Sequence, residues 1–167
     1  DDKDEEFSDN DERSMFFCRG VLETVKKLGW KPDVIHCHGW MTSLMPMYVK
    51  DIYNNDPHFS DTKVVYSLYD DSFNKNWDDR FAEKLKFEGF DEGIIDAIKK
   101  GDHNSLSKTA IKYSDGVVMG SEALNDDLKE AFDNCDGHKM EFESEEVQPK
   151  VVSEFFDKVI EEEALIQ

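Results

Sequence analysis

Short runs of apolar, often β-branched residues alternate along this chain with longer stretches of helical periodicity. The runs are residues 34–38, 63–68 and 116–121, and polar residues do not alternate regularly within them. Strands of this kind are buried on both faces, as in a parallel sheet that helices cover on either side. The alternation therefore predicts an α/β fold with a doubly wound, mostly parallel sheet of the Rossmann type.

Helices are predicted around these strands from the spacing of apolar residues. The strongest patterns cover residues 10–28, with Asp9 or Asn10 as the cap, and residues 149–166 at the carboxyl terminus. Pro46 must lie in the first turn of its helix or kink it. Further helices are expected over residues 40–53, 81–87, 91–100, 104–113 and 125–132, and a short edge strand over residues 140–142. We expect an acidic tail over residues 1–8 and a single domain over residues 9–167.

The charge balance limits the partners that this chain can bind. There are 20 Lys+Arg against 39 Asp+Glu, which gives a net charge of −19. Such a surface repels nucleic-acid phosphates and anionic lipids, so neither nucleic acid nor membrane is an expected partner. Cys18, Cys37 and Cys135 are odd in number and widely spaced. They indicate neither a disulfide framework nor a metal site, so we expect no cofactor and a reducing, cytoplasmic location.

Polar residues follow each of the three predicted core strands. His38 ends the first strand, Tyr69 and Asp70 follow the second, and Ser121 follows the third. In open parallel sheets ligands bind outside the carboxyl ends of the strands, where the strand order reverses. We therefore expect His38, Tyr69 and Ser121 to lie along one rim of the sheet.

Two histidines share one strand and therefore one face. His36 and His38 are two residues apart, so their side chains point to the same side, while that of Cys37 points to the other. A zinc site would need further ligands. We interpret His36 as a buried, hydrogen-bonded residue, and for His38 both a structural role and a role in a cleft stay open.

Four blocks of the sequence follow a recognisable pattern. The blocks are Asp9-Asn10-x-x-Arg13, Gly29-Trp30-x-Pro32-Asp33-Val34-Ile35-His36-Cys37-His38-Gly39-Trp40-x-Thr42-x-Leu44-x-Pro46-x-Tyr48-x-Lys50, Lys63-Val64-Val65-Tyr66-Ser67-Leu68-Tyr69-Asp70, and Lys108-x-Ala110-Ile111-x-Tyr113-Ser114-Asp115-x-Val117 with Ser121. They resemble D-N-x-x-R-F, G-W-x-P-D-V-I-H-x-H-D-W-x-T-x-L-x-P-x-Y-L-K, K-V-V-F-T-I-H-N and K-x-G-I-x-Y-A-D-x-V-T-x-V-S of the amino-terminal domain of bacterial glycogen and starch synthases. The resemblance covers residues 9–124 and indicates a short or partial form of that domain.

The resemblance implies one half of a two-domain glycosyltransferase. Members of the family transfer glucose from ADP-glucose to the end of an α-1,4-glucan with retention, and the amino-terminal domain supplies the acceptor side of the cleft. It implies catalytic positions at His38 and Tyr69. It also implies sugar-binding roles for Trp40, Asp70, Ser121 and Arg13, although Trp40 also suits core packing, Asp70 an ordinary turn and Arg13 a helix surface.

The sequence departs from the family pattern at three places. Gly39 stands where the family has Asp in H-x-H-D-W, and Tyr69 stands where it has His in T-I-H-N. A phenol with a pKa near 10 cannot hold positive charge against phosphate as an imidazole does. The family's K-x-G-G-L loop and second domain are not found in these residues. We therefore expect a glycogen-synthase-like transferase domain that does not turn over alone, or else an inactive glucan-binding module or a partner subunit.

Overall fold

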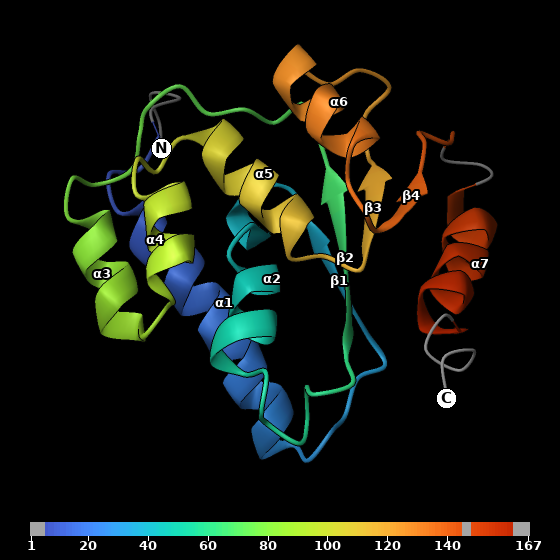
Figure 1. Cartoon of the computed structure of the whole chain (residues 1–167), viewed down its shortest axis with the longest axis horizontal. Helices are drawn as coiled ribbons and strands as arrows, with labels where there is room; N and C mark the ends of the chain where they lie inside the picture. The colour runs from blue at the N-terminus through green and yellow to red at the C-terminus, as the bar shows by residue number, and fades with distance from the viewer. Residues whose placement is uncertain (1–5, 145–147, 162–167) are drawn as a thin grey trace.

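A four-stranded parallel sheet forms the centre of the molecule. The computed structural model describes residues 6–144 and 148–161. The strands are β1 (Val34–His38), β2 (Lys63–Leu68), β3 (Gly116–Met119) and β4 (His138–Met140), side by side in the order β1-β2-β3-β4 (Figure 1). The predicted α/β fold with a parallel sheet is confirmed. The order of these four strands contains no reversal, so the expected switch point is not found among them, and what the strands share is one carboxyl edge.

Helices cover both faces of the sheet, as Figure 1 shows with the sheet seen nearly edge-on. Packed mainly on one side are α1 (Asn10–Lys27), α2 (Met45–Met47), α3 (Phe81–Glu88), α4 (Glu92–Ile98) and α5 (His103–Lys112), while α6 (Asp126–Asp133) follows the carboxyl end of β3. On the other side lies α7 (Gln148–Glu161). The predicted residues 162–166 of that terminal helix, and residues 1–5 of the predicted acidic tail, lie outside the described residues.

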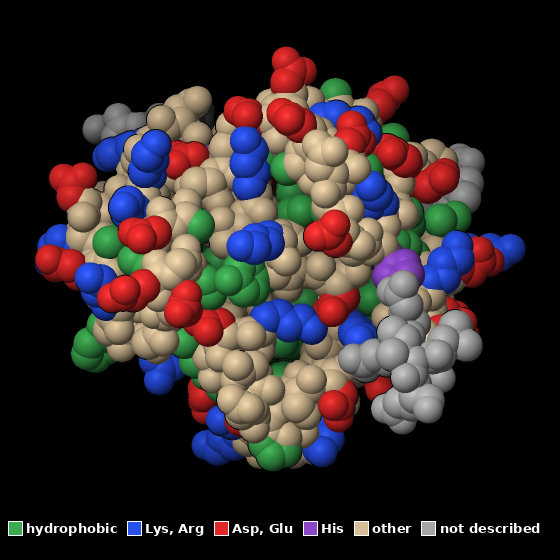
Figure 2. Space-filling view, viewed as in Figure 1, with side chains coloured by type: hydrophobic (Ala, Val, Ile, Leu, Met, Phe, Trp, Pro, Cys, Tyr) green, Lys and Arg blue, Asp and Glu red, His purple; other side chains and the backbone are tan. Residues whose placement is uncertain are grey.

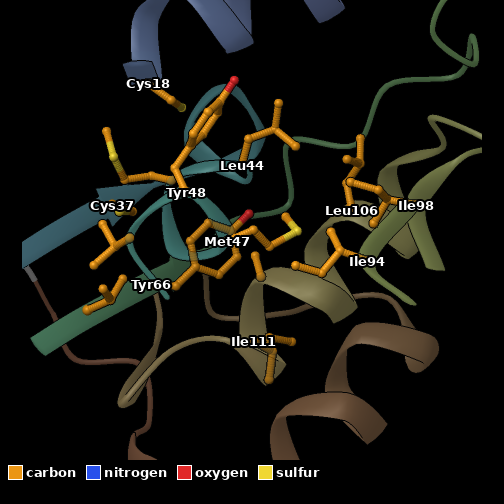
Figure 3. Packing of buried hydrophobic residues seen from close by; sticks show 14 of the residues in the cluster. Cys18, Cys37, Leu44, Met47, Tyr48, Tyr66, Ile94, Ile98, Leu106 and Ile111 are labelled. Carbon is orange, nitrogen blue, oxygen red and sulfur yellow. The ribbon is translucent and has the colours of Figure 1, made fainter. Parts of the chain in front are cut away.

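The first core fills the space between the sheet and the larger helical layer. Because side chains alternate along a strand, Cys37 and Tyr66 point to this layer, where they lie near Met47, Tyr48 and Ile111 (Figure 3). The smaller second core joins the opposite face of the strands to α7 through Val65, Val118, Met140, Phe155 and Val159. The sheet is thus buried on both faces, as the apolar runs predicted.

The predicted helix over residues 40–53 is divided into three pieces. A 3₁₀ turn, η1 (Trp40–Thr42), leads to α2, and a π-helical segment, η2 (Tyr48–Ile52), follows. Pro46 lies in the first turn of α2, where a missing N–H costs little. The N–H of Tyr53 then bonds to the carbonyl of Tyr48, five residues back. This wider turn accompanies the full burial of the Tyr48 side chain.

Two smaller predictions need correction. Asp9 occupies the cap position of α1 but does not cap it through its side chain, which instead pairs with Arg13 at 2.8 Å. The edge strand begins two residues earlier than predicted, since the N–H of His138 bonds to the Asp115 carbonyl and Gly137 packs closely on that same peptide. Among the described residues no helix is both long and apolar enough to cross a membrane.

Candidate functional site at the carboxyl edge of the sheet

The structure brings three of the predicted residues together along the carboxyl edge. His38 ends β1 and its Nδ1 lies 2.9 Å from the hydroxyl of Tyr69, which follows β2. The next residue, Asp70, donates its backbone N–H to Ser121 Oγ at 2.9 Å, which ties the end of β2 to the end of β3. We call His38, Tyr69 and Ser121 the rim. Its formation confirms the geometric expectation drawn from the strand ends.

Gly120 makes room for the Tyr69 ring. Its N–H bonds to the Leu68 carbonyl at 2.7 Å, and a Cβ placed on it would lie 2.5 Å from Tyr69 Cε1. A side chain at position 120 would therefore push the phenol off the rim. Burial raises the pKa of the Tyr69 hydroxyl and lowers the pKa of the His38 imidazole, so both are neutral near pH 7.

Beneath the rim, His36 is hydrogen-bonded as predicted, but it is only partly buried. Its Nε2 lies 2.7 Å from Ser67 Oγ, its ring lies 4.0 Å from that of His38, and Phe156 of α7 packs edge-on against it at 5.1 Å. Burial, and to a lesser extent the neighbouring His38, lowers the pKa of His36 to about 4. This histidine is therefore neutral near pH 7 and lies between the rim and Phe156, which packs against the second core.

The turn after β1 contains the Gly39 that departs from the family pattern. Gly39 has φ +66°, a conformation that side chains disfavour. Its N–H bonds to the Ser67 carbonyl, and its carbonyl accepts the hydroxyl of Tyr66. The carboxylate of Asp71 lies directly over it and accepts the N–H of Trp40 at 3.1 Å.

Trp40 and Arg13 stand in different surroundings from the rim. The Trp40 ring packs edge-on against Phe73 at 5.5 Å and Trp77 at 6.4 Å, so it belongs to an aromatic cluster beside the site. Arg13 is exposed, pairs with Asp9 and lies over the Phe7 ring at 4.4 Å. Within the part of the chain that the structure describes, Arg13 contacts none of the rim residues.

A polar hollow of about 480 Å³ opens at the same edge. It lies between the loop after β2 and the amino ends of α5 and α6, and among its lining residues are Phe73, Asn104, Asn125 and Asp127. The Asn104 amide donates to Asp127 at 3.0 Å and accepts from Asn125 at 3.3 Å. Amides and carboxylates beside an aromatic ring suit a ligand rich in hydroxyl groups, and the volume fits a small-molecule site.

Sequence reasoning did not identify the lining residues from the two helix starts. His103 and Asn104 open α5, and Asn125 caps α6 by accepting the N–H of Leu128. The capping pattern at Asn125 is visible in the sequence, but the meeting of these two helix starts depends on tertiary packing. The contacts of Asp71 with Trp40 and His103 could not be predicted from local sequence, because these partners are 31 and 32 residues away along the chain.

Together these observations describe a Rossmann-like α/β domain with polar side chains and a hollow at the carboxyl edge of its sheet. Comparison with known families then matches residues 1–141 to the starch synthase catalytic domain. The chain belongs to that family of glycosyltransferase domains.

Curated relatives agree with the family match. The chain is 33% identical to a glycogen synthase of Clostridium perfringens over 131 residues, which cover 77% of this chain and 27% of that enzyme. It is 37% identical to the glycogen synthase of Geotalea uraniireducens over 120 residues, covering 70% of this chain and 24% of the relative. The chain thus spans about a quarter of the length of the relatives it matches. No solved structure gives a significant match.

Proposed function

We propose that this chain forms the acceptor side of an α-glucan glucosyltransferase, in which glucose passes from ADP-glucose to an α-1,4-glucan. The observation that carries the proposal is the rim beside a polar hollow, on a domain of the starch synthase family. The side chains of the rim and of the hollow place hydrogen-bond donors and acceptors at fixed positions along one edge of the sheet. Fixed groups of this kind orient an acceptor hydroxyl, which is the part of the catalysis that one half of a cleft can supply.

The His38–Tyr69 pair supplies both a donor and an acceptor to a sugar. With the Tyr69 O–H donating to His38 Nδ1, the imidazole carries its own proton on Nε2. That N–H can donate to a sugar oxygen, and the phenol oxygen retains a lone pair for a sugar hydroxyl. Ser121 holds the neighbouring strand end in register through the Asp70 N–H.

The donor diphosphate needs positive charge that this edge does not concentrate. His38 and Tyr69 are neutral, and α6, which borders the hollow, carries Asp126, Asp127, Glu130 and Asp133. In Figure 2 red carboxylates gather over the part of the molecule that α6 occupies in Figure 1. A second domain, or a separate subunit, is therefore the proposed source of the phosphate-binding cations.

The proposal is tested with the purified 167-residue chain. Maltoheptaose is titrated into labelled protein while backbone amide signals are followed by NMR, and the expected shifts concentrate at His38, Tyr69 and Asn104. His38→Ala weakens binding, whereas Lys31→Ala, on an exposed residue before β1, leaves it unchanged. If maltoheptaose leaves every amide signal in place at millimolar concentration, the proposal is refuted. Glucose transfer from ADP-glucose to glycogen by the chain alone is expected to be undetectable.

A non-catalytic glucan-binding module is the second candidate. The replacement of the family's Asp and His by Gly39 and Tyr69 favours it, because both changes remove groups that can carry charge. A module binds maltooligosaccharide and no ADP-glucose. A partner subunit, in contrast, regains transfer when the chain is mixed with a separately expressed second domain of a glycogen synthase. A cytoplasmic location fits either role, with Cys18, Cys37 and Cys135 all unpaired.

A further inference from the structure

Asp71 bridges three segments of the carboxyl edge. It follows β2, and its Oδ2 accepts the N–H of Trp40 at the start of η1. Its Oδ1 lies 3.4 Å from Nε2 of His103, the first residue of α5. A carboxylate held at both oxygens by groups from two other segments has a fixed orientation, unlike a free turn residue.

The position of this carboxylate coincides with that of a missing side chain. A Cβ placed on Gly39 would overlap Asp71 Oδ2 and would lie 3.8 Å from Cδ2 of Tyr69. Asp71 thus occupies the space into which any side chain at position 39 would project. Gly39 is also the position at which this sequence lacks the aspartate of the family pattern H-x-H-D-W.

Asp71 keeps capacity for a ligand. A carboxylate offers about four lone-pair sites, and the contacts with Trp40 and His103 use one on each oxygen. The side chain is 33% exposed, so solvent reaches it. Tyr69 lies beside the same glycine, which places the carboxylate next to the rim.

His103 gives an independent sign that this corner is built for a partner. Its side chain is only 6% exposed, and its Nδ1 is buried without a hydrogen-bond partner among the described residues. Burying an unpaired polar atom is costly, so this ring nitrogen calls for an explanation beyond core packing. The ring contacts Oδ1 of Asp71, whereas Trp40 contacts Oδ2, and Phe73 packs edge-on against the same ring at 5.4 Å.

We propose that Asp71 is the sugar-binding carboxylate of this site and takes the place of the aspartate that the family pattern carries at position 39. The assignment rests on the proposed function, because the sugar is the acceptor of that reaction. Two of the lone-pair positions of the Asp71 carboxylate bind Trp40 and His103, and the remaining positions accept hydrogen bonds from sugar hydroxyls. His103 acts through Asp71 and is a positioning residue.

The first test compares Asp71→Asn with the wild type by calorimetric titration of maltoheptaose into the full chain. The amide oxygen of asparagine still accepts the Trp40 N–H, so the turn and the fold are retained. Because Asp71→Asn loses a charge-assisted hydrogen bond to the sugar, we expect its affinity for maltoheptaose to fall by a factor of about ten or more. The matched control is Asp61→Asn, which removes the same charge from an exposed residue before the other end of β2 and leaves the affinity unchanged.

The second test moves the carboxylate. Asp71→Gly alone loses binding. In the double variant Gly39→Asp/Asp71→Gly the space over position 39 is vacant, but the positive φ of residue 39 disfavours any side chain, so this variant is less stable than the wild type and recovers part of the binding. The NMR signals of Trp40 and His103 show whether each variant remains folded.

The outcomes separate the two proposals. If the wild type binds maltoheptaose and Asp71→Asn binds equally well, the assignment of Asp71 is overturned while the proposed function stands. If the folded double variant does not recover binding, the claim that Asp71 takes the place of a residue at position 39 is overturned. If the wild type binds no maltooligosaccharide, the proposed function fails and the assignment fails with it.

Discussion

Acidification should destabilise this domain in part through one partly buried histidine. His36 lies between Ser67, His38 and Phe156, where burial lowers its pKa to about 4. In the unfolded chain the same imidazole has a pKa of about 6.5. The unfolded state therefore binds a proton first as the pH falls. Stability that is fully present above about pH 6.5 is lost progressively towards pH 4.

The size of the effect follows from the two pKa values. A difference of about 2.5 units, at about 1.4 kcal/mol per unit, sets an upper limit of about 3.5 kcal/mol, of which about 3 kcal/mol is lost by pH 4. At pH 5 the same relation gives about 2 kcal/mol, and partial exposure of the ring reduces this to about 1–2 kcal/mol. That is a substantial part of the roughly 5–15 kcal/mol typical of a domain.

The assay is urea unfolding of the wild type and of His36→Gln at a series of pH values between about 7 and 5. Glutamine keeps an N–H for Ser67 Oγ but cannot take up a proton. Acid-sensitive carboxylates such as Asp56, whose pKa Lys26 holds low, affect both proteins equally and cancel in the comparison. The wild type should lose about 1–2 kcal/mol more than the variant over this range. Parallel losses in the two proteins would refute the reasoning.

Three further predictions concern the packing and charge of the edge. Gly120→Ala places a Cβ 2.5 Å from Tyr69 Cε1, so we expect about 1–3 kcal/mol of destabilisation by urea unfolding and a shifted His38 ring signal by NMR. Gly116→Ala places a Cβ 3.0 Å from both Phe155 and Val159 of α7, so α7 amides should exchange faster while those of α1 do not change. Tyr69→His allows the rim to bind a proton, so calorimetry should show ADP-glucose affinity rising from about pH 8 to about pH 6 in this variant and not in the wild type.

The strands that form the centre of the sheet were predictable because local sequence bounds them. Pro32 and Gly39 enclose β1, and the apolar run of β2 is continuous over its whole length. The interior of residues 40–53 was not predictable, because the π turn at Tyr48 depends on how its ring is buried against the rest of the protein. The shift of β4 has the same kind of cause, a tertiary contact between Gly137 and Asp115.

The rim was predictable for a topological reason, whereas the surroundings of Asp71 were not. The carboxyl ends of parallel strands meet at one edge whatever the side chains, so His38, Tyr69 and Ser121 had to be neighbours. After Leu68, however, β2 has ended and side chains no longer alternate regularly between two faces. Whether Asp70 or Asp71 turns towards the site is then decided by partners distant in sequence, here Trp40 and His103.

The charge of the carboxyl edge bears directly on the proposed function. His38 and Tyr69 are neutral near pH 7, since burial lowers the pKa of the first and raises that of the second, so neither can compensate the charge of a phosphate. Lys108, a cation of α5 close to the hollow, is held by Asp127 at 2.7 Å, which offsets its charge. An uncharged glucan chain therefore matches this surface better than a nucleotide diphosphate does. Under the proposed function, glucosyl transfer therefore requires cations from a second body, and sugar binding does not.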